Sequence, residues 1–575
     1  MEYGSLKMKI TRLPYLQISS VPPLLIFVSI SLFNLQLLAA QTGTLKLTVL
    51  DSTTNQIVPA RVEIQGSDGE YYVAEDALLV GGDCDMSDHG AGLHDLETTL
   101  ASFHREVGNP YTRSTQFYSN GKSSIYLPSG TAAIRVYKGP EYELHVEKVD
   151  IQAGKTTQHE IRISRWVNMP EKGWYSADDH LHIPRPSKEL NPYIMKMMQA
   201  EDIHVGNLLQ MGKVVNFNIA PQYSHGEESY YQEGGYILAA GQENPRTHFL
   251  GHTITLGAKT ALHSPEEYLI YRLLWQEASK QGAINGYAHY GSMFSGQSGL
   301  PLVLHHNLMH FIEVLQFNRS DYEAWYEVLN LGFRVTPTAG TDYPCGSNLP
   351  GHERFYTKVD GDFTYNNWLD GVRRGKTFVT TGPILEFRVN GHDIGEEVML
   401  EGPDSLRIEG KVIFDNQLDD LQRIELIENG QVVGSFPRTN MEGNISFSIN
   451  HPMKETSWLT LRGYGNKLKQ SMSVRPWHFR SFKPMSTVHS APIYVTIKNA
   501  SPFTSHSRTK VLARKWLAHL EDLETMLEED NIEYLAQKLL DPEFDAVPKD
   551  ILIKNRLALF DEIRDAKDFF IQLSE

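Results

Sequence analysis

Two histidines separated by one residue form the clearest chemical signal in the sequence. His180 and His182 end the run Trp174–His182, which follows an alternating, strand-like segment, Ile161–Arg165. Successive side chains of a strand point to opposite faces, so two histidines at this spacing point the same way. Imidazole nitrogen is a common ligand of zinc, iron and related ions. The pair therefore predicts a metal site, although a surface pair on a loop would have the same spacing.

Five further segments carry candidate ligands. Each candidate lies at or near the end of a run that resembles a strand. In an α/β barrel the strand ends converge on one face, where functional sites are built. A bridging carboxylate, several imidazoles and a second carboxylate would together hold two metal ions. The segments are Gly241–Glu243, Gly251–Gly257, Asn285–His289, His310–Asn318 and Thr336–Asp342.

The order of these motifs resembles the PHP superfamily of metallohydrolases (polymerase and histidinol phosphatase), and more narrowly its CehA/McbA-type secreted branch. The passage Leu369–Gly395, with Arg-Gly-Lys-Thr-Phe-Val-Thr-Thr-Gly-Pro and then a strand and Asn-Gly, is typical of that branch. The resemblance covers about residues 170–400. It implies a central distorted β/α barrel. It also implies a hydrolase of ester, carbamate or phosphoester bonds that uses a hydroxide bridging two divalent ions, zinc, manganese or iron.

The resemblance implies two metal positions that share one carboxylate. The third position of the superfamily is missing, because Asp342 is followed by Tyr-Pro instead of x-His and the run Asp202–Met211 lacks a Thr-Asp-His motif. His248 competes with His252 for one position, and we prefer His252 because its Gly-His-x-x-x-Leu-Gly context matches better. The implied ligands are His180, His182, Glu243 and Asp342 for one ion, and Glu243, His252 and His289 for the other.

Four residues are candidates for the chemistry itself. Asp342 or His289 could pass a proton to the leaving group if either lies at a strand end beside the ions. His352 and Arg354 follow on a loop rich in glycine and proline, where functional residues are common. Arg354 could hold a substrate carboxylate or phosphate with a bidentate pair, or form a structural salt bridge. The histidines interpreted as structural are His204, His305, His306 and His310.

Composition and periodicity divide the chain into five segments. Residues 1–40 form a predicted signal peptide, and residues 41–165 alternate like a β-sandwich that resembles the carboxypeptidase regulatory-like domain. Residues 166–382 carry the metal motifs, residues 383–500 return to β character, and residues 501–575 have apolar stripes at helical spacing. The predicted fold class is multidomain, α/β plus all-β: a central PHP-like barrel, flanking β-sandwich modules and a helical C-terminal tail.

The beginning of the chain has the layout of a secretory signal peptide. Basic residues precede the apolar stretch Pro22–Phe33, and small residues stand before Gln41. We therefore expect a secreted or periplasmic protein without a stable membrane span, the alternative being an uncleaved membrane anchor. Cys84 and Cys345 lie far apart in the sequence, and we expect them to be unpaired, although an oxidising compartment would allow one disulfide.

Composition also limits the partners. The formal net charge is −17 and the Lys and Arg residues are scattered, which argues against a nucleic-acid-binding protein. We expect a small-molecule substrate, and the C-terminal stripes could form a homo-oligomer contact. The alternative function is a non-catalytic or glycan-associated secreted binding protein with a degenerate PHP domain. The insert at residues 81–116 is interpreted as a solvated loop, with metal binding or a position over the site as alternatives.

Overall fold

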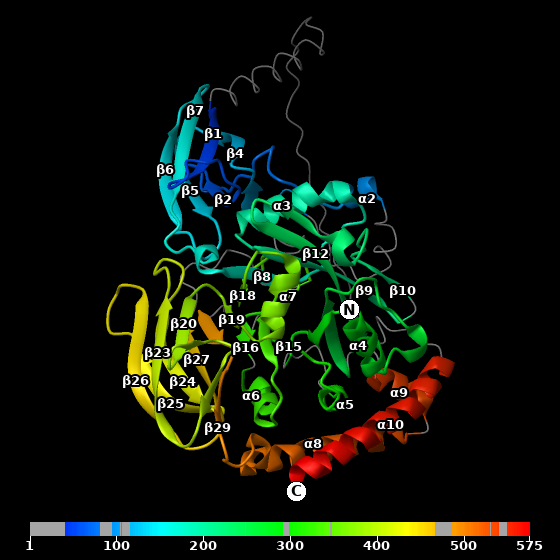
Figure 1. Cartoon of the computed structure of the whole chain (residues 1–575). Coiled ribbons are helices and arrows are strands. Elements are labelled where there is room, and N and C mark those ends of the chain that lie inside the picture. The colour runs from blue at the N-terminus through cyan, green and yellow to red at the C-terminus, as the bar shows by residue number, and fades with distance from the viewer. Residues whose placement is uncertain are drawn as a thin grey trace, which may run out of the picture.

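The structure is a computed structural model in which most of the chain after the first 40 residues is described (Figure 1). The predicted signal peptide and most of the insert at residues 81–116 lie outside the described residues. The described residues are 41–80, 95–103, 105, 115–214, 216–247, 249–290, 298–320, 322–345, 348–465, 486–529, 531–539 and 549–575.

The N-terminal part of the chain forms two β-sheets around one core. The strands are β1 (Thr42–Asp51), β2 (Ala60–Gln65), β3 (Gln116–Ser119), β4 (Lys122–Pro128), β5 (Gly130–Tyr137), β6 (His145–Ile151) and β7 (Thr156–Ile163), with one short helix, α2 (Leu96–Ala101). One sheet has the order β4-β1-β7 and the other β3-β2-β5-β6. Leu47, Val62 and Ile134 meet in the shared core, because alternate side chains of each strand point inward.

A mixed sheet in the middle of the chain carries the candidate ligands. Its main strands are β8 (Trp174–Leu181), β9 (Val205–Lys213), β12 (Tyr236–Thr247), β13 (Gly251–Leu256), β14 (Ile284–Tyr287), β15 (Phe311–Gln316), β17 (Thr336–Ala339), β18 (Arg354–Lys358) and β19 (Thr377–Thr380). Three short strands pair with it: β10 (Asn216–Ile219), β11 (Tyr231–Glu233) and β16 (Arg319–Ser320). β8, β9 and β12 run parallel, β13 is antiparallel to β12 and β14, and β15 is parallel to β14 and β17.

Short helices pack against this sheet. They are α3 (Asn191–Ala200), α4 (Tyr271–Lys280), α5 (Leu300–Leu304), α6 (Tyr322–Asn330) and α7 (Tyr365–Arg373). Single turns of 3-10 helix lie at η2 (Pro170–Lys172), η3 (Lys188–Leu190), η4 (Gly226–Ser229) and η5 (Pro265–Glu267). Trp275 of α4, Trp325 of α6 and Trp368 of α7 are fully buried in the core beneath the sheet.

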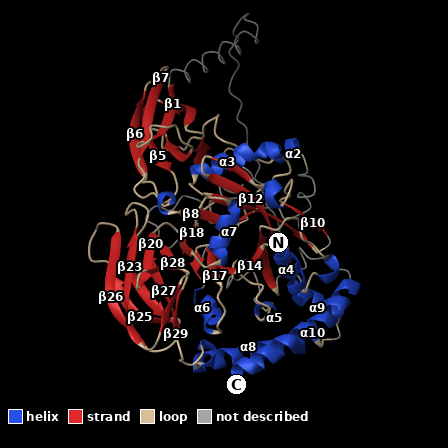
Figure 2. Cartoon of the chain, in the orientation of Figure 1, coloured by secondary structure: helices blue, strands red, loops and turns tan. Residues whose placement is uncertain are grey.

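The predicted central β/α barrel is wrong. Among the described residues 41% lie in strands and 25% in helices, and Figure 2 shows more strand than helix. The element order does not alternate one strand with one helix as the barrel requires. β12 ends at Thr247 and the antiparallel β13 begins at Gly251, which leaves no room for a helix between them. β8 pairs with parallel β9 on one side and antiparallel β18 on the other. The apolar runs were read correctly as strands, but their pattern does not distinguish a parallel partner from an antiparallel one.

The same sheet continues through β19 into the C-terminal β region. The added strands are β22 (Glu397–Leu400), β24 (Leu421–Glu428), β25 (Gln431–Pro437), β27 (Ser457–Gly465), β28 (Thr487–Ser490) and β29 (Ile493–Ile497). A separate four-stranded sheet contains β20 (Ile384–Val389), β21 (His392–Asp393), β23 (Asp404–Ile413) and β26 (Asn444–Met453). Both sheets contribute to one core that includes Phe387, Ile408 and Leu461. Because β19 pairs with β28, the central and C-terminal regions share backbone hydrogen bonds.

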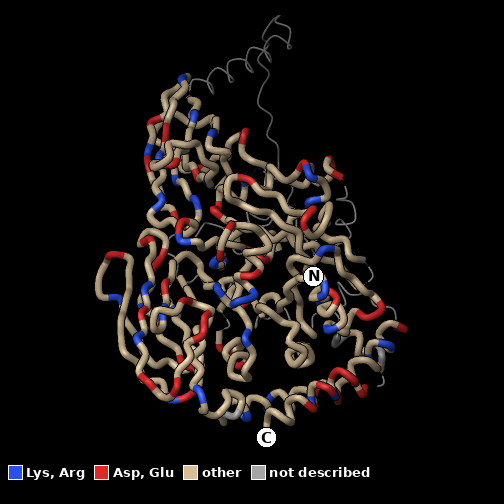
Figure 3. The backbone as a smooth tube through the Cα atoms, viewed as in Figure 1, with Lys and Arg blue, Asp and Glu red and all other residues tan. Residues whose placement is uncertain are grey.

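Long helices at the C-terminal end lie along the central region (Figure 1). They are α8 (Ser507–Leu527), α9 (Ile532–Leu539) and α10 (Lys549–Ser574), preceded by η6 (Phe503–Ser505). Trp516 of α8 and Phe570 of α10 pack into the same core as the central sheet. Within the described part of the chain, no helix is long and apolar enough to cross a membrane. Figure 3 shows Lys and Arg interspersed with Asp and Glu, without a continuous basic tract.

A buried ion pair joins the N-terminal sheets to the central region. Arg61 Nε of β2 lies 2.6 Å from Glu201 Oε1, just after α3, and both side chains are 2% exposed. The hydroxyl of Tyr118 donates to the same carboxylate oxygen at 2.7 Å. The guanidinium of Arg61 also stands over the ring of Tyr137. Removing one partner from such a pair leaves the other charge buried without compensation.

We expect Glu201→Gln to lower the free energy of unfolding by about 3–5 kcal/mol, because Arg61 would lose its carboxylate partner in a buried place. Asp370→Asn is the matched control, since Asp370 pairs with Arg373 at the exposed surface and should change stability by less than about 0.5 kcal/mol. Chemical denaturation of both variants measures the difference. A loss for Glu201→Gln no larger than the control's would contradict this interpretation of the junction.

Candidate metal centre

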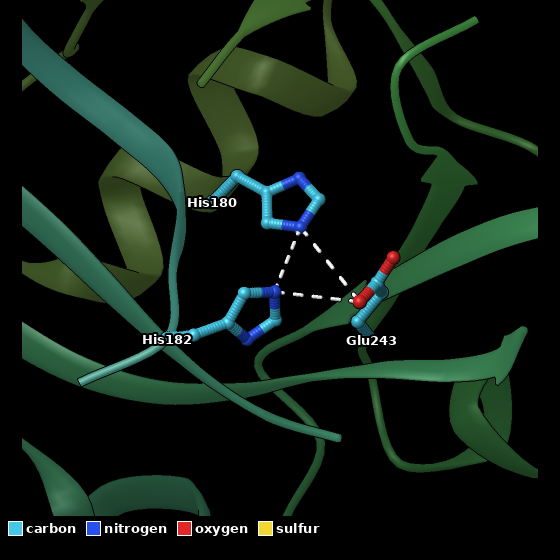
Figure 4. Close-up of side chains that lie close together, drawn as sticks. All are labelled: His180, His182 and Glu243. Atoms are coloured by element: carbon cyan, nitrogen blue, oxygen red, sulfur yellow. Dashed lines mark hydrogen bonds and ion pairs between the residues drawn. The ribbon is translucent and has the colours of Figure 1, made fainter. Parts of the chain in front are cut away.

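Two histidines at the end of β8 face one buried carboxylate of β12. His182 Nε2 lies 3.3 Å from Glu243 Oε2, and His180 Nε2 lies 3.8 Å from the same oxygen. All three side chains are buried and point toward one another (Figure 4). β8 and β12 are both parallel to β9, so their carboxyl ends lie at the same edge of the sheet. The histidine pair and the glutamate are therefore positioned by strand ends.

Asp342 approaches the same two histidines from the loop after β17. Its Oδ1 atom lies 3.4 Å from His180 Nε2 and 3.1 Å from His182 Nε2. Its backbone has φ 54°, in the left-handed region that costs a non-glycine residue about 1–3 kcal/mol. Such conformations persist where the surrounding structure and the function require them.

His252 and His289 lie on the other side of Glu243. His252 Nδ1 is 2.7 Å from Glu243 Oε1, and His289 Nε2 is 3.4 Å from the same oxygen. His252 belongs to β13, the antiparallel neighbour of β12. His289 follows β14 and has φ 31°, which makes it a second left-handed residue of the site. Glu243 therefore presents one oxygen to each set of histidines.

The structure brings together all six ligands that the resemblance implied. His180, Glu243 and His289 each belong to two of the three overlapping groups, in which the ligand atoms lie within 4.8 Å of one another. His289 also lies near His180 and Asp342. The resemblance assigned His289 to the other metal position, so this proximity was not predicted. These residues are called the ligand cluster below: His180, His182, Glu243, His252, His289 and Asp342.

Hydrogen bonds to the far side of two imidazoles turn their lone pairs inward. His182 Nδ1 lies 3.0 Å from the carbonyl oxygen of Leu209, and His180 Nδ1 lies 3.2 Å from Glu313. A proton on each Nδ1 is the assignment that these acceptors favour, and it leaves each Nε2 as an acceptor. The two Nε2 atoms then face each other at 3.1 Å beside two carboxylates. Two imidazole acceptors and two carboxylates that converge in this way fit a bound cation.

The pKa shifts favour the metal-binding form in three ligands of the cluster but not in all: despite burial, Glu313 and Asp342 raise the pKa of His180, and Asp342 and Glu243 raise that of His182. Burial alone would raise the pKa of Glu243, but Arg246 and His252 hold it well below its usual range. Burial likewise opposes ionisation of Asp342, whereas His180 keeps its pKa below the usual value. Burial, together with the charge of Arg246, lowers the pKa of His252 to about 3, so this imidazole is neutral at pH 7. Carboxylates and neutral imidazole are the forms that coordinate metals.

Three residues behind the cluster were missed as site residues from the sequence. Glu313 of β15 accepts from His180 and from the backbone N–H of His289 at 2.5 Å, so it orients two ligands. Asp178 accepts from the backbone N–H groups of His180 and Thr341 and ties β8 to the loop that carries Asp342. Glu313 lies in a segment that the sequence did single out, but Asp178 gave no signal beyond its proximity to the histidine pair.

Arg246 is the third missed residue. Its Nε atom lies 3.4 Å from Glu243 Oε2, and its side chain is 12% exposed. Arg246 follows Glu243 on β12, across an irregularity in the pairing with β13. This cation neutralises part of the negative charge of the site and lies within reach of groups bound there.

The structure does not bring His352 and Arg354 into the ligand cluster. Arg354 is buried, and its guanidinium donates to the backbone carbonyls of Gly351, Glu201 and Asp202. These bonds hold the loop after β17 against the end of α3. They match neither the expected pair with a substrate anion nor the expected salt bridge. His352 Nε2 lies 3.1 Å from the side-chain oxygen of Asn318. Both residues line a cavity of about 60 Å³ at the junction with the N-terminal sheets, near Arg61.

The expectation of unpaired cysteines is wrong. Cys345 is disulfide-bonded. The sequence contains only one other cysteine, Cys84, which lies outside the described residues. His248, the alternative to His252, also lies outside the described residues, so the preference for His252 stays a prediction.

We expect Glu313→Gln to weaken metal affinity by about 10–100-fold while the protein stays folded, because the carboxylate that orients His180 and the backbone of His289 is neutralised. Glu323→Gln is the matched control on an exposed side chain of α6. Competition between each variant and a chromophoric zinc chelator measures the affinity. Equal affinities for the two variants would show that Glu313 does not support the ligands.

Comparisons with known proteins leave the family of the chain open. No protein-family model matches the sequence, and no curated protein matches it. Among solved structures, the minor pilin GBS52 of Streptococcus agalactiae is similar over 22% of this chain at 13% identity, with a TM-score of 0.14. The match spans 46% of the pilin chain. A likeness this weak supports no common fold, and membership of the PHP superfamily stays a prediction from motifs.

Proposed function

We propose that the protein is a metal-dependent hydrolase that cleaves an ester, carbamate or phosphoester bond with two divalent ions held by the ligand cluster. The observation that carries the proposal is the position of Glu243. Its Oε2 atom faces His180 and His182, and its Oε1 atom faces His252 and His289. A carboxylate placed between two sets of imidazoles is an arrangement that suits two neighbouring metal ions.

The donor set favours borderline transition metals. Four imidazoles and two carboxylates suit zinc, manganese or iron better than magnesium or calcium, which prefer oxygen ligands. Two such ions, when bound, would supply a hydroxide at neutral pH and polarise the bond that is cleaved. The contribution of the chain is to hold six ligands in a buried position with their donor atoms already converged.

The remaining roles belong to side chains at the rim. The Asp342 side chain is 15% exposed, whereas those of His180 and His182 are almost fully buried. Of the two candidates for proton transfer, Asp342 is more exposed than His289, whose side chain is 3% exposed, so Asp342 is the first candidate to pass a proton to a leaving group. Arg246 would attract a developing negative charge on the substrate from its position beside Glu243.

The proposed location is an oxidising compartment outside the cytoplasm. The disulfide at Cys345 supports it, because such bonds persist mainly in secreted and periplasmic proteins. The sequence of residues 1–40 supports it independently through its signal-peptide layout.

We expect two metal ions per chain rather than three, because the ligand cluster has two sets of donors around one shared carboxylate. Elemental analysis of the purified protein after supplementation with Zn²⁺ or Mn²⁺ gives the ratio. Three ions per chain, or none, would contradict the proposal. Two ions without turnover of any ester, carbamate or phosphoester would favour a metal-dependent binding protein instead.

We expect Glu243→Gln to lose metal and hydrolysis together, since an amide presents only one oxygen and no charge to the two sets of histidines. Turnover of chromogenic esters and phosphoesters should fall by several orders of magnitude, while circular dichroism stays unchanged. Glu266→Gln is the matched control, because the same change is made at an exposed glutamate that pairs with Lys554 away from the cluster. A Glu243→Gln protein that retains both ions and full activity would mean that the bridging carboxylate is another residue.

A further inference from the structure

Arg185 is a buried arginine without a carboxylate partner in the described part of the chain. Its exposed fraction is 0%. Nε donates to the side-chain oxygen of Gln222 at 3.1 Å, and Nη1 donates to that of Asn191 at 3.1 Å. Nη2 is buried and has no hydrogen-bond partner. The guanidinium lies 4.6 Å from the centre of the Tyr223 ring.

Other buried arginines of the protein are compensated. Arg61 pairs with the carboxylate of Glu201, and Arg354 donates to three backbone carbonyls. A guanidinium offers five N–H donors and stays charged at neutral pH, so its burial without an anion costs several kcal/mol. Burial lowers the pKa of Arg185 to about 10, with Tyr223 opposing the shift. Stacking on one aromatic ring offsets only part of that cost, about 2 kcal/mol.

Arg185 lies close to the ligand cluster along the chain and in the fold. Arg185 follows His182 by three positions in the sequence, which limits the distance between their Cα atoms to about 10 Å. Gln222, the partner of Arg185, also donates from its side chain to the carbonyl of Ile183 and from its backbone to Gln210. Gln210 follows the residue of β9 whose carbonyl accepts from His182. The same segment of β9 therefore anchors both the metal ligand and the arginine.

The surroundings of Arg185 are positive or neutral. Lys188 lies 5.7 Å from the centre of the same Tyr223 ring, so two cations adjoin one tyrosine. Burial and the charge of Arg185 lower the pKa of His225 to about 4, which leaves this histidine neutral. Arg185 forms no ion pair with a described residue, although Glu189, Glu227 and Glu228 lie on nearby turns. Tyr223, whose ring lies against the guanidinium, is itself only half-buried.

We propose that Arg185 receives an anionic group, a carboxylate or a phosphate, of the molecule whose scissile bond is held at the ligand cluster. This inference rests on the proposed function and narrows its substrates to compact anions. A planar guanidinium recognises either group through two parallel hydrogen bonds, for which Nη2 is available. For an anion to reach the guanidinium, the Tyr223 side chain must move aside. The bound anion then supplies the negative charge that no described residue provides to Arg185.

The test measures anion affinity by calorimetry on the full-length protein. Succinate and inorganic phosphate are titrated separately, which distinguishes a carboxylate site from a phosphate site, and succinamide serves as the neutral analogue. We expect the wild-type protein to bind at least one of the two anions. Arg185→Gln should lower the affinity for that anion at least tenfold, about 1.4 kcal/mol, and leave succinamide binding and metal content unchanged. Arg272→Gln is the control, because Arg272 pairs with Glu562 of α10.

Two results would overturn the inference. One is a wild-type protein that binds neither anion, and the other is an Arg185→Gln variant that binds the anion as tightly as the wild type. If Arg185→Gln does not fold, Arg185→Lys replaces it. Loss of the planar guanidinium should lower the affinity for the anion at least threefold, and unchanged affinity counts against the proposal. Repeating the titrations after metal removal separates the two claims, because failure of the hydrolase proposal alone leaves the dependence on Arg185 intact.

Discussion

The arrangement of this protein depends on one buried carboxylate, that of Glu243. A carboxylate that is 1% exposed would be costly if it were alone. Here it is surrounded by four imidazoles and Arg246, and those neighbours outweigh the effect of burial on its pKa. The two oxygens face different histidines, so any shift of β12 relative to β8 or β13 would disturb both sets at once. Metal ions between these donors would balance the negative charge of the two carboxylates, Glu243 and Asp342, that Arg246 alone does not neutralise.

Strand pairing positions the Glu243 carboxylate, and the backbone conformation of the adjoining loops positions the histidines and Asp342 around it. Parallel pairing through β9 brings the ends of β8 and β12 to one edge, and antiparallel β13 returns His252 to the same place. His289 and Asp342 enter from loops with left-handed backbones, where strain is retained because Glu313 and Asp178 hold the adjoining backbone N–H groups. The contact between Gly340 and His180 is so close that an added Cβ would lie 2.5 Å from the histidine Cβ.

The sequence predicted which side chains would converge, but not the architecture around them. Each of these residues lies in a short motif at a strand end, so it could be identified from residue type and spacing without knowledge of which strands pair. The barrel prediction was wrong because apolar runs reveal strands but not their direction, as β12 and β13 demonstrate. Glu313, Arg246 and Arg185 act through contacts between distant segments, which no local pattern records. The disulfide at Cys345 was missed for the same reason.

Anomalous diffraction from crystals of the full-length protein loaded with Zn²⁺ or Mn²⁺ tests the central claim most directly. The account predicts two anomalous peaks per chain, about 3.5–4 Å apart, on either side of the Glu243 carboxylate. His180, His182 and Asp342 should adjoin one peak, and His252 and His289 the other. A single peak, or peaks that do not contact Glu243, would contradict it.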